Sequence, residues 1–324
     1  MKNALLQLHL AVFLWGFTGV LGRAITLDAA VLVWWRVLLT ALLVAFFLTL
    51  RRQWVTVDRR DFGRLVAVGS LMAIHWVAFY GSIKASNASV ALICLSTASV
   101  FTALLDPLVN KSRFDRWEIG IGVIALAGVW LIYRAQLAFG WGILLGVIAA
   151  ILSAVFTVLN KPISTKYPAR TVVFWEMATG VVLLSAVLPF AANALHIDRW
   201  WPRQNSFLSF LPAPDLWGGL KAFFATPNDW VWLVLLSLCC TVWAQSLAVS
   251  ALSKLSSFTV TLSVNIEPLY GMALAFLFFD EAQELTAGFA WGVALIFLSV
   301  VLQMARVVGP GWAARWIRWR SGLD

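Results

Sequence analysis

Long apolar segments, separated by short polar turns, follow one another along almost the whole chain. A helix crosses a bilayer with roughly 20 predominantly apolar residues. Polar or helix-breaking residues such as Asp28, Asn87, Gly140 and Pro168 mark the turns between the segments. The pattern therefore predicts ten transmembrane helices, at about residues 4–22, 30–50, 63–83, 88–110, 117–134, 140–160, 171–191, 228–250, 256–279 and 286–306.

The composition predicts an all-α integral membrane protein. Of 324 residues, 61% are hydrophobic and only 12% are charged, and the mean hydropathy is +0.86. A soluble domain has too little interior to hide this much apolar surface. Cys94, Cys239 and Cys240 lie in apolar segments without metal-ligand spacing, so they are predicted to be packing residues.

The net charge of +9 would suggest a nucleic-acid partner in a soluble chain, but in a membrane protein it is assigned loop by loop. With the amino terminus inside, the inner segments carry most of the lysines and arginines, including Lys2, Arg51 and Lys166. Lysine and arginine are enriched in cytoplasmic segments of membrane proteins. Both termini are therefore predicted to be cytoplasmic, and no nucleic-acid partner is expected.

Two segments lie outside the predicted helices. A long outer loop at about 192–227 is rich in proline and tryptophan, and it is expected either to lie passively along the membrane surface or to cover an outer mouth. The tail at 309–324 places Trp312, Trp316 and Trp319 on one helical face beside two arginines. This pattern predicts a short basic helix on the inner leaflet.

The stretch Phe258–Glu281 has the length of a transmembrane helix but carries polar residues near its middle. A carboxylate at that depth, such as Glu267, costs roughly 2.5–3.5 kcal/mol on insertion scales and normally faces a bundle interior or a water-filled cavity. Pro268 has no N–H, so it breaks the backbone hydrogen bonding beside Glu267 and Asn265. The stretch is therefore either part of a solute-binding site or a buried glutamate beside a harmless kink.

An internal repeat divides the chain into halves predicted at residues 1–135 and 136–308. The fourth and ninth helices align without gaps at an offset of 169, which sets Ser99 beside Pro268. Each half has an odd number of helices, so the halves must cross the membrane in opposite senses and a site is expected near the midplane between them. Arg36 and Glu176 follow aromatic pairs in the second and seventh helices; they should lie toward opposite sides of the membrane and not pair.

Several motifs resemble those of a known family. They are Trp15-Gly16, Arg36, the stretch YGSIKASNASVALICLSTASVFTA at 80–103, Gly120, Leu126-Ala127-Gly128, and Pro268 followed thirteen residues later by Glu281. Over nearly its whole length the chain resembles the drug/metabolite transporter superfamily, of the EamA type. Ser99 and Ser112 stand where the first half of the family pattern has proline and glutamate, which suggests that the second half carries more of the site.

The resemblance implies ten helices in an inverted 5+5 repeat that exports or exchanges small metabolites. It also implies a central cavity lined by helices 1–4 and 6–9, with helices 5 and 10 at the periphery, and it makes Trp15 a candidate lining residue. It implies no particular cargo, because members of the family differ widely in what they carry.

Two titratable residues are predicted near the membrane centre. Glu267 is eleven residues into the ninth helix and His75 is twelve residues into the third. A buried carboxyl and an imidazole can both exchange protons, so both suit proton coupling. The alternative for His75 is a hydrogen-bonded packing residue beside Trp76.

The other candidates each allow a functional and a structural interpretation. Arg36 either holds a substrate carboxylate, or it has a structural role, in which it snorkels to the outer interface or braces the helix bundle. Glu176 allows the same functional and structural interpretations on the inner side. Lys84 either attracts anionic solutes at an outer mouth or caps the third helix. Hydroxyls in the fourth helix either contact substrate or bond to their own helix. The hydroxyl residues meant are Ser96 and Ser99. Tyr270 and Trp243 are candidates for aromatic walls of the binding site.

Two GxxxG pairs, Gly142/Gly146 and Gly288/Gly292, predict close helix packing, and the second pair is a candidate homodimer contact. No phosphate loop, nucleotide fingerprint, zinc motif or nucleophile–base constellation is present, so no cofactor is expected and ATP-driven transport by this chain alone is not favoured.

These observations together predict a multi-pass secondary transporter of the bacterial inner membrane. It would move small metabolites such as amino acids by alternating access, with or without proton coupling, and its partners would be the solute and the lipid bilayer. The alternative is an integral membrane enzyme acting on lipid or isoprenoid substrates, which would need catalytic residues clustered at one membrane face. A non-transporting assembly subunit is a third interpretation.

Overall fold

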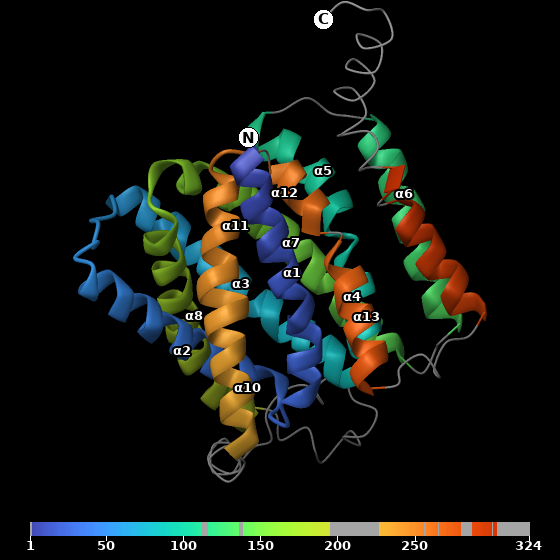
Figure 1. Ribbon diagram of the computed structural model, residues 1–324, viewed down its shortest axis with the longest axis horizontal. Coiled ribbons are helices and arrows are strands. Elements are labelled where there is room, and N and C mark those ends of the chain that lie inside the picture. The colour runs from blue at the N-terminus through green and yellow to red at the C-terminus, as the bar shows by residue number, and fades with distance from the viewer. Residues whose placement is uncertain are drawn as a thin grey trace, which may run out of the picture.

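The computed structural model describes residues 2–111, 116–135, 139–194, 227–255, 257–264, 266–279, 287–299 and 301–302, and the elements in these ranges are helices (Figure 1). The first half contains α1 (Lys2–Ala24), α2 (Ala29–Leu50), α3 (Arg59–Ala85), α4 (Ala88–Leu95), α5 (Ala98–Asn110) and α6 (Arg116–Ala135). The second half contains α7 (Gly140–Lys166), α8 (Ala169–Ala194), α10 (Pro227–Ser237), the π-helix η5 (Leu238–Trp243), α11 (Ala244–Leu252), α12 (Ser257–Val264), α13 (Glu267–Phe279) and a last helix, Ala287–Ser299. Asn265, Ser112, Glu281, the tail and most of the predicted outer loop lie outside the described residues.

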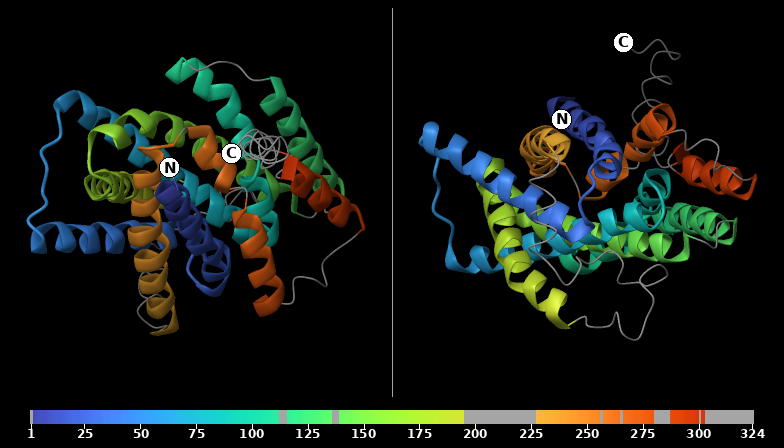
Figure 2. Two further views of the ribbon diagram at one scale, coloured as in Figure 1. Left: turned by 45° about the horizontal axis from the view of Figure 1, so that its top comes forward. Right: turned by 90° about the horizontal axis from the view of Figure 1, so that it is seen from below.

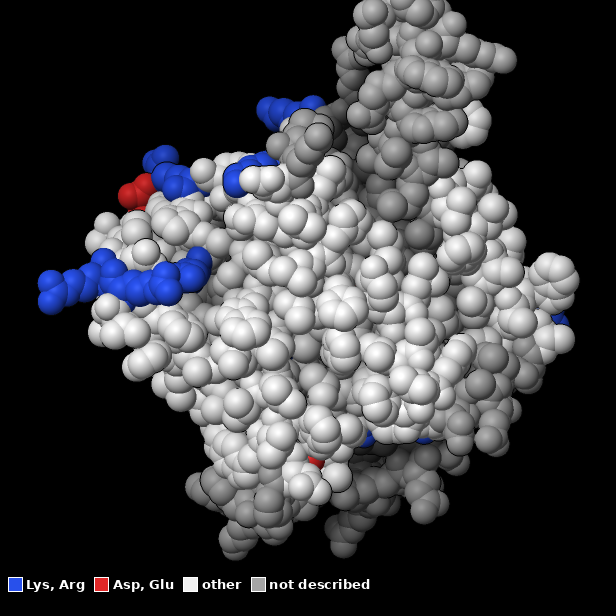
Figure 3. All heavy atoms as spheres, in the orientation of Figure 1, with Lys and Arg blue, Asp and Glu red and all other residues white. Residues whose placement is uncertain are grey.

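Helices occupy all ten of the predicted ranges within the described residues. Seven helical stretches are long and apolar enough to cross a membrane, whereas Ile119–Arg134, Glu267–Phe279 and Ala287–Ser299 are apolar but shorter. Figure 3 shows basic side chains gathered toward the end of the molecule that holds the start of α1, with a broad uncharged surface beside them. The chain is therefore a multi-pass membrane protein, while ten crossings and the orientation of the termini stay predictions.

The two halves contain the same broken helix. Adding 169 to the bounds of α4 (88 and 95) and α5 (98 and 110) gives those of α12 (257 and 264) and α13 (267 and 279). The break predicted beside Pro268 is confirmed, and its counterpart at Ser96 and Thr97 was missed. The causes differ, because the first-half hydroxyls bond to their own helix, at 2.6 Å from Ser96 Oγ to the Ile93 carbonyl, whereas Pro268 lacks an N–H.

Helix packing also repeats between the halves. The first helix of each half packs against the third and fourth of the other: α1 contacts α11 and α13, and α7 contacts α3, α4 and α5. The two second helices, α2 and α8, pack on each other. This is the contact pattern of a pseudo-two-fold axis, and it interlocks the halves rather than setting them side by side.

The helix α6 and the last helix lie next to each other at the edge of the bundle (Figures 1 and 2). They cross where a Cβ on Gly128 would meet the Gly292 carbonyl at 2.7 Å and a Cβ on Gly292 would meet the Gly128 carbonyl at 2.7 Å. Gly292 is thus used inside the chain, so the motif gives no support to the predicted homodimer contact. Gly142 and Gly146 likewise allow close packing, against Ser86 and Cys94.

Candidate functional site

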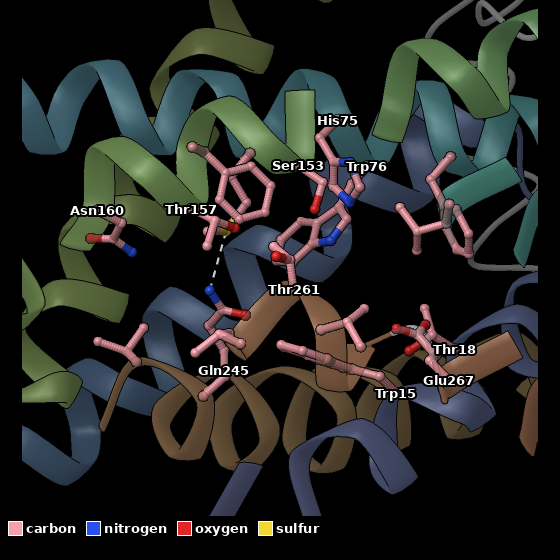
Figure 4. Close-up of a pocket in the computed structure, with 18 of the residues that line it drawn as sticks. Trp15, Thr18, His75, Trp76, Ser153, Thr157, Asn160, Gln245, Thr261 and Glu267 are labelled. Atoms are coloured by element: carbon pink, nitrogen blue, oxygen red, sulfur yellow. Dashed lines mark hydrogen bonds between the residues drawn. The ribbon is translucent and has the colours of Figure 1, made fainter. Parts of the chain in front are cut away.

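A cavity lies between two walls, each built from helices of both halves. One wall is α3 and α7, with Leu95 of α4, and the other is α1, α11, α12 and α13. The cavity encloses about 770 Å³ of empty space when the part open to solvent is included. Its lining comprises Trp15, Thr18, Arg36, Met72, His75, Trp76, Phe79, Leu95, Ser153, Phe156, Thr157, Asn160, Gln245, Ala248, Val249, Leu252, Val260, Thr261, Val264 and Glu267 (Figure 4).

The aromatic walls are supplied by Trp15, Trp76, Phe79 and Phe156. Trp15 was a predicted candidate, but the predicted aromatic walls Tyr270 and Trp243 lie outside the cavity. Tyr270 is 39% exposed and packs edge-on against Phe13, with the ring centroids 5.5 Å apart, and Trp243 is 51% exposed. Both side chains therefore project from the outer faces of their helices, toward the membrane rather than toward the cavity.

Arg36 of α2 is buried at 1% exposure, so the alternative that it snorkels to the membrane surface is wrong. Its Nε donates to Thr241 Oγ1 at 2.9 Å, its Nη1 donates to the Tyr80 hydroxyl at 2.8 Å, and its Nη2 donates to the Cys240 carbonyl at 3.5 Å. The guanidinium carbon lies 3.9 Å from the centre of the Trp76 ring, which adds a cation–π contact. Arg36 therefore braces α2 against α3 and η5 while it faces the cavity.

The π-helix η5 supplies the acceptors for this arginine. A π-helix bonds i→i+5 instead of i→i+4, so it leaves carbonyl groups without their usual helical partners and often marks a functional site. Here the Cys240 carbonyl accepts hydrogen bonds from Trp15 Nε1, at 3.0 Å, and from Arg36. Thr241 donates to the Leu236 carbonyl at 3.1 Å, which directs its oxygen lone pairs toward Arg36 Nε.

Glu267 is the first residue of α13 and is 4% exposed. The broken helix places its carboxyl group at a helix amino terminus, where the macrodipole favours negative charge. Arg36 is the cation whose charge acts on Glu267, yet the two groups form no ion pair within 4.0 Å among the described residues. A buried cation and a buried ionisable carboxyl group therefore line one cavity without a direct ion pair.

His75 lines the same cavity from α3. Its Nδ1 lies 2.7 Å from the Ala149 carbonyl, which can only accept, so Nδ1 carries the hydrogen. Its ring packs edge-on against Phe156 at 5.3 Å between ring centres. His75 is thus hydrogen-bonded and packed, as the structural interpretation expects, and it also faces the cavity.

Glu176 of α8 is 1% exposed but does not line the cavity. Asn160 Nδ2 donates to its Oε1 at 2.6 Å. Glu176 Oε2 and Asn160 Oδ1 are buried without a hydrogen-bond partner among the described residues. Figure 4 places Asn160 and Glu267 toward opposite ends of the cavity, so the two buried glutamates are separated, and Arg36 and Glu176 have different partners.

The remaining sequence candidates do not reach the cavity. The Ser96 hydroxyl bonds to the Ile93 carbonyl at 2.6 Å, and Ser99 Oγ lies 3.3 Å from the Ser96 carbonyl. Lys84 donates to the Ile25 carbonyl just after α1, so it fastens that turn. These contacts are the structural alternatives expected for the two serines, whereas Lys84 holds the α1–α2 turn instead of capping α3.

Several cavity residues were missed by sequence reasoning. They include Thr18, Ser153, Thr157, Asn160, Gln245 and Thr261. Asn160 and Gln245 carried a signal, because an amide inside an apolar helix is costly unless it faces a partner or a cavity. The hydroxyl residues carried none, since serine and threonine satisfy themselves within their own helix.

Comparisons with known proteins agree with this architecture. The profile of the EamA-like transporter family matches residues 2–134 and again residues 140–305. A solved structure described only as "Crystal structure of protein" is similar with a TM-score of 0.63 and 15% identity, over 93% of this chain and 97% of that one, which shows a shared fold. No curated protein matches the sequence. Since the two profile matches cover almost all of the chain, this membrane protein belongs to the EamA-like transporter family, whose members move small molecules across membranes.

Proposed function

We propose that this protein is a secondary transporter that exports or exchanges small zwitterionic metabolites, such as amino acids, across a bacterial inner membrane. The observation that carries the proposal is that a buried cation, Arg36, and a buried ionisable carboxyl group, Glu267, line one cavity without pairing directly. A zwitterion carries the two complementary charges on one small molecule.

Arg36 suits the carboxylate of such a solute. A guanidinium has five N–H donors, and three are used by Thr241, Tyr80 and the Cys240 carbonyl, which leaves two. These contacts hold the planar group in place before the solute arrives, so little side-chain freedom is lost on binding. Trp15 and Trp76 beside it offer apolar surface for the rest of the solute.

Glu267 suits the ammonium group and also offers a route to proton coupling. One carboxylate binds either a proton or an ammonium group at a given time, so the two compete for Glu267. Competition of this kind, joined to alternating access, exchanges protons for solute. His75, which faces the same cavity through a ring already oriented by Ala149, is the second candidate for proton transfer.

The two walls of the cavity are the bodies that would rock. Lys166 Nζ and the Tyr167 hydroxyl donate to Asp61 at 2.5 and 2.8 Å, which fastens α7 to the start of α3 within one wall. In the other wall, the N–H and hydroxyl of Thr26 donate to Asp229 at 2.9 and 2.6 Å, which fastens the α1–α2 turn to α10. The two walls also contact each other: Lys161 Nζ of α7 donates to the Leu252 and Leu255 carbonyls at the end of α11, both at 2.5 Å, and Arg36 joins α3 to η5. A rocking motion would have to break and remake such contacts.

The experiment uses proteoliposomes and a panel of radiolabelled amino acids, each tested with and without an imposed pH gradient. We expect gradient-driven flux in the wild type and loss of the gradient response in Glu267→Gln. Glu176→Gln is the matched control, because it removes the second buried glutamate of the described residues, which lies outside the cavity lining. Flux that survives unchanged in Glu267→Gln and ignores the gradient would contradict proton coupling.

Competition by solute analogues tests the zwitterion assignment. An amine that lacks the carboxylate, and an acid that lacks the ammonium group, should each inhibit roughly tenfold or more weakly than the complete amino acid, since each forfeits one charge-assisted contact. Equal inhibition by all three compounds would contradict recognition of both charges.

A further inference from the structure

A second hollow lies at the end of the bundle where α1 begins, away from the central cavity. It is framed by the ends of α1 and α2, the start of α8 and the outer side of α11, and it shares no lining residue with the cavity. Its lining is Gln7, Leu48, Arg52, Gln53, Trp54, Val55, Pro168, Ala169, Arg170, Ser246, Leu247 and Ser250. We call it the α2–α8 groove.

The charge of the α2–α8 groove is entirely positive among the described residues that line it. Arg170 Nη1 donates to the side-chain oxygen of Gln53 at 3.1 Å, which aligns one guanidinium across the groove. Arg52 has no ion pair among the described residues, and its φ of 51° lies in the left-handed region, which L-residues seldom adopt. This conformation closes the end of α2, where the Gln53 N–H donates to the Leu48 carbonyl at 2.9 Å, and it fixes the place of Arg52 beside the groove.

Uncharged donors stand beside the two arginines. The groove includes Pro168, Ala169 and Arg170 at the start of α8, where the positive end of the helix dipole favours an anion. The Ser246 hydroxyl oxygen is buried and has no hydrogen-bond partner among the described residues. Gln7 and Ser250 complete the polar side of the groove, 3.5 Å apart across α1 and α11. Guanidinium, amide and hydroxyl donors converging on one hollow match a phosphate group.

The apolar side of the groove shows which phosphate compound it suits. Arg52 follows the apolar helix Ala29–Leu50 and Arg170 precedes the apolar part of α8, so both arginines lie where the apolar spans end, at the depth of lipid headgroups. Leu48, Val55 and Leu247 give the same groove an apolar side. Trp54 is held there by its edge-on contact with Phe174, at 4.9 Å between ring centres. Tryptophan is typical of the membrane interface.

We propose that the α2–α8 groove binds an anionic phospholipid, with the phosphate between Arg52 and Arg170 and an acyl chain against Leu48 and Leu247. Basic pockets between transmembrane helices are a recurrent way to hold anionic headgroups. The site is independent of the proposed transport function, because it shares no residue with the cavity.

The test is lipid binding by the full-length protein, measured by native mass spectrometry in detergent. Phosphatidylglycerol is compared with phosphatidylcholine of the same acyl chains, for the wild type and for Arg52→Gln/Arg170→Gln. Each arginine near a headgroup contributes roughly fivefold in affinity, so the double variant should bind phosphatidylglycerol about 25-fold more weakly, with phosphatidylcholine unchanged.

Matched controls separate this site from general attraction to a basic surface. Arg51→Gln/Arg60→Gln removes the same charge from the same end of the molecule but outside the groove lining, and it should change phosphatidylglycerol affinity less than twofold. Arg52→Lys/Arg170→Lys keeps the charge and should keep the preference for phosphatidylglycerol over phosphatidylcholine. The proposal fails if both glutamine double variants weaken binding equally, or if neither does.

A competition experiment distinguishes binding of a lipid from binding of a soluble phosphate compound. Inorganic phosphate and glycerophosphoglycerol, the headgroup without acyl chains, are added as competitors at the concentration of the lipid. We expect neither to displace phosphatidylglycerol, because the apolar side of the groove contributes to lipid binding. Displacement by either compound at equal concentration would show a phosphate site instead and would overturn the lipid assignment.

Discussion

Arg36 and Glu176 hold matching places in the two halves, but their surroundings differ. Each follows a tryptophan in the second helix of its half, and each is 1% exposed. Arg36 donates three hydrogen bonds and stacks over Trp76. Glu176 accepts from Asn160, and its second oxygen is buried without a hydrogen-bond partner among the described residues.

The difference shows how a repeat acquires a one-sided function. The shared backbone supplies two equivalent buried positions, and the π-helix η5 near one of them supplies carbonyl and hydroxyl acceptors for a cation. The ring of Tyr80 also fits there because α1 carries a glycine: a Cβ on Gly22 would lie 2.3 Å from Tyr80 Cε1. The surroundings of Arg36 therefore supply acceptors for its charge, whereas those of Glu176 leave one carboxyl oxygen without a partner among the described residues.

Removing the arginine should have the largest effect on stability. We expect Arg36→Met to lower the free energy of unfolding by about 2 kcal/mol, because it loses three charge-assisted hydrogen bonds and a cation–π contact, while relief from burying a charge offsets part of the loss. The measurement is reversible unfolding in mixed micelles, followed by circular dichroism. The exposed Arg60→Met is the control and should change stability by less than about 0.5 kcal/mol.

Stability of Arg36→Met within about 0.5 kcal/mol of wild type would contradict the bracing role. In that case the hydrogen bonds of Arg36 would contribute no more than the cost of burying its charge, and the comparison with Glu176 would lose its basis.

Removing single partners of the arginine should have intermediate effects. Tyr80→Phe and Thr241→Val each delete one acceptor of Arg36, so each should cost about 1 kcal/mol. The same changes made in the Arg36→Met background should cost less than about half as much, since the interaction is already gone. A double-mutant cycle on unfolding free energies measures this coupling, and full additivity would show that the three residues act independently.

The broken helix shows how much of the fold could be predicted. Pro268 and Glu267 mark the second-half break in the sequence, because proline removes an N–H and a mid-span carboxylate needs a cavity. The first-half break at Ser96 and Thr97 has no such mark, since these residues also occur in continuous membrane helices. The π-helix η5 carries no mark either, because LCCTVW is an ordinary apolar sequence.

The aromatic residues show why the cavity lining was harder to predict than the helices. A soluble helix shows its buried face as an apolar stripe, but a membrane helix is apolar all round. Tyr270 and Trp15 therefore look alike in the sequence, although Trp15 lines the cavity and Tyr270 packs on Phe13 at the outer surface. Costly polar residues such as Arg36 and Glu267 could be placed inside, because only the interior compensates their burial.

Neutralising the glutamate should have the smallest effect. In Glu176→Gln the new side-chain carbonyl can still accept from Asn160 Nδ2, and the new amide N–H groups stand near the Asn160 oxygen that lacks a partner. The substitution also removes a carboxyl group from a fully buried position, so we expect the free energy of unfolding to fall by less than about 0.5 kcal/mol or to rise. The transport of Glu176→Gln in proteoliposomes should still respond to the pH gradient.

A loss of more than about 2 kcal/mol would show that Glu176 contributes as much to stability as Arg36, because such losses follow the breaking of a fully satisfied buried polar network. Loss of the gradient response with normal stability would instead move the coupling role from Glu267 to Glu176.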